Sequence, residues 1–150
     1  MLVRTSGYEV GLRSEVVPQL QTTFTVFSLD FDSELLFLGD AGTTEASRPS
    51  RRVGFEWTNI YTPTSWLNVD ADIAFSRARF TNADPVGDRI PGAVEGVATL
   101  TAAIDNRRPW YGSARVRYFG PRPLIEDNTV RSHSTTLVSR TSRIRGLDDS

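Results

Sequence analysis

Apolar and polar residues alternate with a period of two along most of the chain. The apolar residues occupy every second position in Tyr8–Leu12, Val53–Trp57, Leu67–Phe75, Val94–Ile104 and Trp110–Tyr118. Because successive side chains of a β-strand point to opposite faces, each segment predicts a strand with one apolar and one polar face.

Three further segments fit this alternation less well. In Thr22–Asp32 the apolar residues change phase after Val26, which predicts a β-bulge at that point. Ser134–Val138 has the character of a seventh strand that is cut short. Residues 139–150 are polar and show no clean period, so we expect a disordered tail after position 138.

The connections between the predicted strands alternate in length. Short turns lie at 17–20, 62–65 and 105–109, and long connections lie at 33–51, 81–93 and 120–133. In an up-and-down sheet, consecutive connections lie at opposite ends, so all the long ones share one end. Short turns at one end and long loops at the other are typical of outer-membrane barrels.

The predicted fold is therefore all-β, an up-and-down antiparallel sheet of six to seven long strands that forms part of a transmembrane β-barrel. The well-patterned segments are about ten residues long, as in strands that cross a bilayer. Aromatic residues also gather near short turns, with Tyr61 and Trp66 around one and Trp110 and Tyr111 after another. The alternative is a soluble β-sandwich binding module that uses its long loops for recognition.

Composition narrows the function. The chain has 150 residues, enough for one domain, and 39% of them are apolar. It contains no cysteine and no lysine, which excludes disulfides, thiolate metal sites, cysteine nucleophiles and Schiff-base chemistry. A single histidine, His133, cannot build a multi-histidine metal site. The net charge of −1 does not point to nucleic acid, and no apolar run is long enough for a transmembrane helix.

Several segments resemble a known family when they are taken in order. They are Gly7–Arg13, Phe27–Leu35, Ser50–Glu56, Ala78–Phe80, Ile90–Ala93 and Arg117–Asn128. This series is similar to the C-terminal part of the β-barrel of TonB-dependent receptors, which are outer-membrane transporters of Gram-negative bacteria. The resemblance covers about residues 5 to 138, so residues 1–138 are expected to be a partial barrel.

The resemblance implies a barrel of 22 strands with a plugged lumen. Its partners would be the rest of the barrel, the plug domain, the TonB complex through an N-terminal part, outer-membrane lipid and a scarce nutrient such as a ferric siderophore. It implies no cofactor and no enzymatic activity. We expect this chain to be a fragment that is not functional alone, since an open sheet leaves two unpaired edges in lipid.

Five charged residues on the polar faces are the candidates for the lumen of such a barrel. They are Glu56, Asp70, Asp72, Arg115 and Arg117. Lumen residues of opposite charge commonly pair and contact a plug; substrate binding is the alternative role. Paired carboxylates on a β scaffold also leave a glycosidase as a third possibility, although no phosphate-binding loop, HExxH motif or nucleophile elbow occurs.

Two other charged groups stand at predicted strand ends: an acidic cluster of Asp30, Asp32 and Glu34, and an arginine run of Arg48, Arg51 and Arg52. The acidic cluster either holds a hard cation such as Ca²⁺ or consists of solvated rim charges. The arginine run either meets an anion, such as a phosphate of lipopolysaccharide, or is a solvated loop. Residues 126–128 resemble a family motif, but their chemistry alone suggests no task.

Overall fold

The computed structural model describes residues 4–33, 35–38, 43–46, 48–82, 85–105 and 110–144. Its strands are β1 (Thr5–Ser14), β2 (Leu20–Phe31), β3 (Leu35–Leu38), β4 (Thr43–Ala46), β5 (Ser50–Thr64), β6 (Leu67–Phe80), β7 (Gly96–Asp105), β8 (Trp110–Phe119) and β9 (Thr135–Ile144). Among the described residues, no helix is long and apolar enough to cross a membrane.

Seven of the strands form one antiparallel up-and-down sheet in the order β1-β2-β5-β6-β7-β8-β9. The remaining two, β3 and β4, form a separate hairpin within the long connection between β2 and β5. The all-β, up-and-down prediction is thus confirmed. The hairpin is an addition, because its segment carries no clear alternation.

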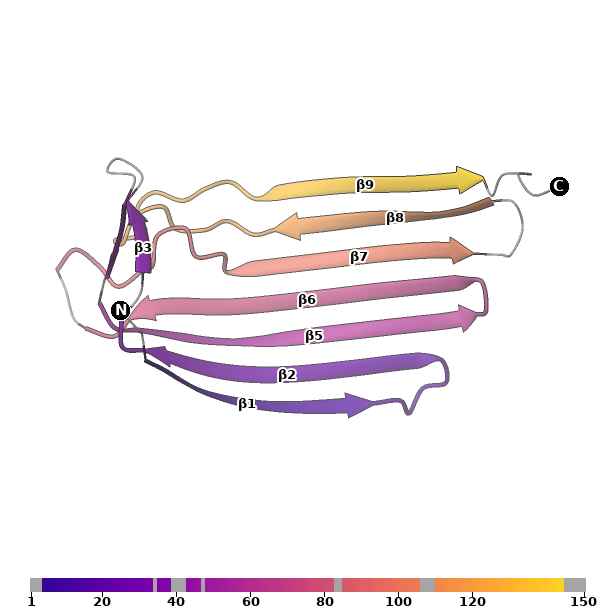
Figure 1. Cartoon of the computed structure of the whole chain (residues 1–150), viewed down its shortest axis with the longest axis horizontal. Helices are drawn as coiled ribbons and strands as arrows, with labels where there is room; N and C mark the ends of the chain where they lie inside the picture. Colours follow the sequence, from indigo (N-terminus) through magenta and orange to yellow (C-terminus); the bar gives the residue numbers. More distant parts are fainter. Residues whose placement is uncertain are drawn as a thin grey trace.

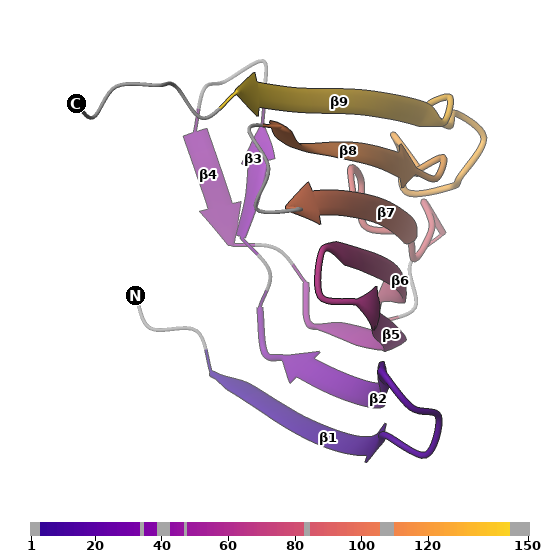
Figure 2. The same cartoon turned by 90° about the vertical axis from the view of Figure 1, so that its right-hand side faces the viewer.

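The two ends of the sheet differ, as the connection lengths predicted. The tight turns that join β1 to β2 and β5 to β6 lie at one end, and the β3–β4 hairpin and the longer connections β6–β7 and β8–β9 lie at the other (Figure 1). We call these the turn end and the loop end. Viewed from the turn end, β1 and β9 form opposite, unjoined edges of an open sheet (Figure 2).

The register gathers the apolar residues on one face of the sheet, which we call the outer face. Val10, Val26, Phe55 and Phe75 lie opposite one another across four strands. The ring centroids of Phe55 and Phe75 are 6.0 Å apart, and those of Phe24 and Phe55 are 5.7 Å apart. Val10 is nevertheless 72% exposed and Phe75 is 43% exposed, so the described chain leaves this face uncovered.

The buried core is small and lies on the opposite, inner face at the loop end. Within the described part of the chain, its apolar residues are Ala78 and Phe80 from β6 and Ile90 from the β6–β7 connection. Ala93 packs against them. A β-sandwich would bury the large apolar face between two sheets; here that face is exposed, so the structure does not support the soluble alternative.

The β-bulge expected within Thr22–Asp32 is wrong. β2 pairs without a break with β5 from Leu20 to Phe31 and with β1 from Thr22 to Phe31. The change of apolar phase arises because Phe27 lies on the inner face, where it packs against Gly54: a Cβ atom added there would lie 2.7 Å from the Phe27 ring. The register irregularity occurs instead between β5 and β6, at Tyr61 and Thr64.

β9 continues beyond position 138, where the sequence predicted a disordered tail. Ser139 pairs with Arg115, Arg140 with Ala114, and the ladder runs to Ile144. Pairing along a strand edge uses backbone groups, so polar side chains do not prevent it. The expected tail therefore does not begin at Ser139, and residues 145–150 lie outside the described part of the chain.

The close contact at Gly54 leads to a stability prediction. A Cβ atom there would lie 2.3 Å from the Phe75 carbonyl oxygen, whereas at Gly96 it would make only an ordinary contact of 3.9 Å with the Phe75 ring. We expect Gly54→Ala to lower the free energy of unfolding by about 1–3 kcal/mol through overpacking. The measurement is urea unfolding of the chain refolded in detergent micelles, followed by tryptophan fluorescence.

Gly96→Ala is the matched control for this substitution. It should change the free energy of unfolding by less than about 1 kcal/mol, because alanine is tolerated better than glycine inside a strand. Equal effects of the two substitutions would show that the packing of Phe27 and Phe75 against Gly54 does not constrain β5.

Candidate functional site

The five charged candidates from the sequence all lie on the inner face. Register rows across β6, β7 and β8 align Asp70 with Thr101 and Arg115, and Asp72 with Thr99 and Arg117. Glu56 lies on the same face of β5, opposite Thr25 and Ala74. The inner face thus carries an acidic strip on β6 and a basic strip on β8, with threonines between them.

Among the described residues, these carboxylates and guanidinium groups do not pair directly. Arg115 Nε donates to Thr101 Oγ1 at 3.1 Å, and Asp70 Oδ1 accepts from Asn68 Nδ2 at 2.8 Å. The expected ion pairs are missing because β7 separates the two strips by two strand spacings, roughly 10 Å. The acidic strip and the basic strip therefore lie on either side of β7 on the inner face without pairing with each other.

A second polar feature lies on the inner side at the loop end, where Arg48 joins two connections. Its Nη2 donates to Glu126 Oε2 at 2.6 Å and to the Gly87 carbonyl at 3.0 Å. Its guanidinium carbon is also 4.2 Å from the centroid of the Phe80 ring, a cation–π distance. Gly87 belongs to the β6–β7 connection and Glu126 to the β8–β9 connection, so one side chain holds both.

A second set of ion pairs centres on Glu95, just before β7. Its two carboxylate oxygens accept from Arg89 Nη1 at 2.7 Å and from Arg131 Nη2 at 2.5 Å. Arg131 also donates to Asn128 Oδ1 at 2.6 Å. The Glu95 side chain is only 21% exposed. We call the whole set the loop junction: Arg48, Gly87, Arg89, Glu95, Glu126, Asn128 and Arg131.

Backbone contacts close the same junction. Arg89 N donates to the Glu126 carbonyl at 3.1 Å, and Gly92 N donates to the Pro123 carbonyl at 2.8 Å. Gly87 has a φ of 134°, and a Cβ atom there would lie 2.3 Å from the Glu126 carbonyl oxygen. Only glycine allows this approach, so the β6–β7 and β8–β9 connections form one packed unit.

The structure assigns a task to residues 126–128, which the sequence alone did not. Glu126 binds Arg48, while Asp127 Oδ1 accepts from both the backbone N and the Oγ1 of Thr129, each at 2.9 Å. Asn128 adopts a left-handed φ of 63° and accepts from Arg131. Residues 126–128 therefore form a turn and bind it to the rest of the loop junction through Arg48 and Arg131.

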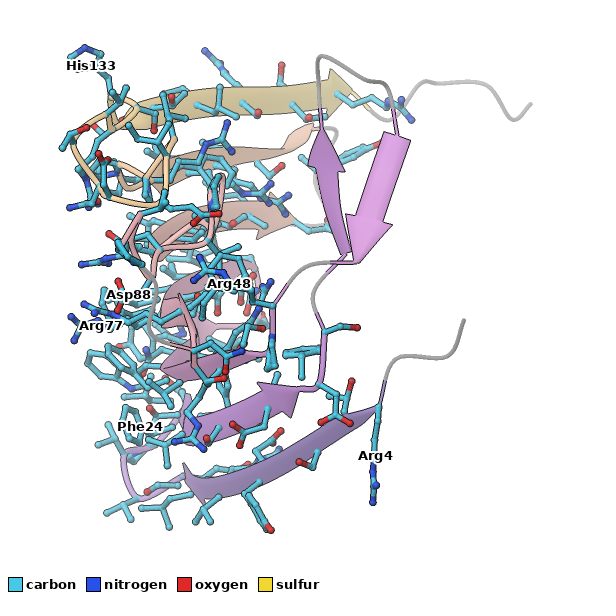
Figure 3. All side chains as sticks on the ribbon, turned by 90° about the vertical axis from the view of Figure 1, so that its left-hand side faces the viewer. Arg4, Phe24, Arg48, Arg77, Asp88 and His133 are labelled. Atoms are coloured by element: carbon cyan, nitrogen blue, oxygen red, sulfur yellow. The ribbon has the colours of Figure 1, made fainter. Side chains whose placement is uncertain are left out.

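The remaining sequence candidates do not converge. Asp30 pairs with Arg51 Nε at 2.6 Å, and Glu34 lies outside the described residues. No group of three potential metal ligands occurs in the part of the chain that the structure describes. His133 is exposed in the β8–β9 connection (Figure 3).

The arginine run separates in the same way. Arg48 enters the loop junction, Arg51 lies on the outer face, and Arg52 lies on the inner face 5.6 Å from the Phe31 ring. A single anion site made of these three arginines is therefore excluded, because two of them lie on opposite faces of β5 and the third is engaged elsewhere.

Three solved receptors have a similar fold. The ferric preacinetobactin receptor BauA of Acinetobacter baumannii matches with a TM-score of 0.71 at 18% identity, covering 92% of this chain and 22% of the receptor. The ferric yersiniabactin uptake receptor FyuA of Yersinia pestis matches with a TM-score of 0.73 at 19% identity, covering 93% of this chain and 22% of the receptor. The ferric-catecholate import receptor Fiu of Escherichia coli K12 matches with a TM-score of 0.68 at 20% identity, covering 92% of this chain and 20% of the receptor.

These receptors are TonB-dependent outer-membrane proteins, so the chain has the fold of a segment of their β-barrel, as the sequence resemblance predicted. The chain spans about a fifth of their length. Comparison with protein-family models and with curated proteins gave no match.

The loop junction predicts a local effect of Arg48. Arg48→Met keeps the length of the side chain but removes the ion pair with Glu126, the bond to Gly87 and the cation–π contact. The side chains of Arg48 and Glu126 are only 21% and 27% exposed. We therefore expect the free energy of unfolding to fall by about 1–2 kcal/mol. Hydrogen exchange of the backbone amides of Arg89 and Gly92 should become faster.

Arg13→Met is the matched control, because it removes an arginine–glutamate pair at the turn end whose side chains are 62% and 64% exposed. It should leave the exchange of Arg89 and Gly92 unchanged, as exposed pairs contribute little. If Arg48→Met also left that exchange unchanged, Arg48 would not hold the two connections together.

Proposed function

We propose that this chain is a wall segment of a TonB-dependent transporter in the outer membrane of a Gram-negative bacterium. The observation that carries the proposal is the division of one long-stranded sheet into a continuous apolar outer face and a charged inner face. Lipid covers an apolar face of this kind, and a plug or water fills the space behind it.

The exposure of the outer face supports a lipid environment. Leu12 is 72% exposed, Trp57 45%, Leu100 52% and Val138 73%, and these residues come from four different strands of one sheet. A soluble protein of this size rarely leaves such a continuous apolar surface in water. No catalytic residue and no cofactor is part of the proposal.

The partners follow from the edges and the inner face. β1 and β9 each have one unpaired side, which the remaining strands of the barrel would cover. Asp70 and Asp72 on one strip, and Arg115 and Arg117 on the other, would face a plug domain in the lumen, with Glu56 beside them. TonB would act on parts of the transporter outside this chain.

The proposed cargo is a ferric siderophore or another scarce nutrient. Support comes from the three similar receptors, each of which is named for a ferric ligand. In this chain, the surface offered to such a ligand would be the loop end, where the junction fixes the relative positions of the β6–β7 and β8–β9 connections. The individual siderophore would be selected by the whole receptor.

Native tryptophans allow a direct test of the outer face. In a variant with Trp66→Phe and Trp110→Phe, Trp57 is the single emitter. After reconstitution of the 150-residue chain into phosphatidylcholine vesicles, we expect lipids brominated on their acyl chains to quench Trp57 strongly. Iodide in the aqueous phase should quench it weakly, because Trp57 faces the acyl chains.

The control moves the emitter by one residue to the inner face. Thr58→Trp combined with Trp57→Phe, in the same background, should show the reverse pattern, with quenching by iodide and little by brominated lipid. If Trp57 were quenched by iodide in a chain that stays monomeric and folded without lipid or detergent, the transporter proposal would fail and a soluble binding module would replace it.

A further inference from the structure

The outer face ends at the loop end in a group of charged side chains. The register places Arg77 directly opposite Val53, and Arg79 opposite Arg51, which in turn lies opposite Asp30. Asp88, from the β6–β7 connection, pairs with Arg79. We call Asp30, Arg51, Arg77, Arg79 and Asp88 the rim cluster. In Figure 3, Arg77 and Asp88 lie on the same side of the sheet as the apolar Phe24.

The charges of the rim cluster do not balance. Arg51 Nε pairs with Asp30 at 2.6 Å, and Arg79 Nη1 pairs with Asp88 at 2.5 Å. Arg77 is exposed and has no hydrogen-bond or ion-pair partner among the described residues. The cluster therefore carries one positive charge in excess, and on β5 and β6 it adjoins the apolar outer-face residues Val53, Phe55 and Phe75.

Arg51 can contribute further donors to an anion. It contacts Asp30 through Nε, and its side chain is 59% exposed, which leaves its Nη groups as donors. A guanidinium group matches a phosphate with two parallel hydrogen bonds. Arg51 and Arg77 lie on adjacent strands and are offset by two residues along the ladder. They are diagonal neighbours on the outer face, roughly 7–8 Å apart, so both long side chains can reach one phosphate group.

The depth of the cluster indicates the kind of anion. Arg77 lies two residues beyond Phe75 on β6, roughly 7 Å farther along the strand. Phe75 and its neighbours Phe55 and Val26 belong to the apolar face. An anion bound by Arg77 thus sits directly above a surface that fits acyl chains, which is the arrangement of a phosphorylated lipid and not of a free ion.

We infer that the rim cluster binds the headgroup phosphate of an acylated, phosphorylated glycolipid of the lipid A type in the outer leaflet, with its acyl chains on the apolar face below. This inference rests on the proposed function, because it needs the outer face to lie in lipid. It also corrects the anion site expected from the sequence: of Arg48, Arg51 and Arg52, only Arg51 takes part, and β6 supplies the other arginines.

The test measures how much lipid A the chain retains. The 150-residue chain is reconstituted into phosphatidylcholine vesicles that contain lipid A, extracted with mild detergent and captured, and the bound lipid A is quantified by mass spectrometry. The double variant R51Q/R77Q should retain about tenfold less lipid A than the unmodified chain, because it loses the charge-assisted hydrogen bonds to phosphate. Dephosphorylated lipid A should not be retained by either protein.

The matched control is Arg140→Gln, which removes one exposed arginine from the outer face of β9 toward the turn end. It should retain as much lipid A as the unmodified chain. Equal loss in R140Q and R51Q/R77Q would indicate a general charge effect and overturn the inference. Full retention by R51Q/R77Q, or displacement of lipid A by inorganic phosphate, would also overturn it.

Trp57 quenching by brominated lipid, measured in the same vesicles, separates this inference from the proposed function. If Trp57 is quenched and R51Q/R77Q retains lipid A normally, the chain lies in lipid and only the rim assignment is wrong. If Trp57 is not quenched, the outer face does not meet acyl chains, and the proposed function fails together with the inference.

Discussion

Unbroken backbone pairing between antiparallel neighbours determines where the side chains of this sheet lie. Because side chains alternate along a strand, a slip of one residue would move all the apolar residues of that strand to the inner face. The pairing of β2, β5, β6, β7 and β8 keeps one register throughout the central parts of these strands. The apolar outer face, the separated acidic and basic strips, and the rim cluster all follow from this common register.

The loop end is held differently, since the β6–β7 and β8–β9 connections contain no paired strands of their own among the described residues. There, hydrogen bonds and ion pairs of arginine side chains hold the connections together. Arg48 and Arg131 each join groups that lie far apart in the chain, and Gly87 lets two backbones approach more closely than any other residue would allow.

The sequence predicted the strands where periodicity was strong, as in Leu67–Phe75, and it predicted the asymmetry of the two ends. It predicted only the beginning of β9, at Ser134–Val138, because polar residues such as Arg140 hide the rest of a strand whose stability comes from pairing with β8. It also missed the contact between Arg48 and Glu126. That contact joins positions 78 residues apart, and neither residue belongs to a periodic segment, so no local pattern pointed to it.

The placement of the arginines shows how position along a strand and phase together decide a residue's role. Arg51 and Arg52 are neighbours in sequence, yet one lies above the apolar face and the other reaches over an inner-face ring. Arg77 and Arg79 point to the same face of the sheet as Arg51. This shared face brings three arginines from separate positions in the sequence into one cluster. An arginine two residues deeper in the same phase would enter the apolar face, where an unpaired charge is costly. If the outer face lies in lipid, as proposed, the rim cluster is where guanidinium groups of β5 and β6 adjoin the apolar surface without entering it.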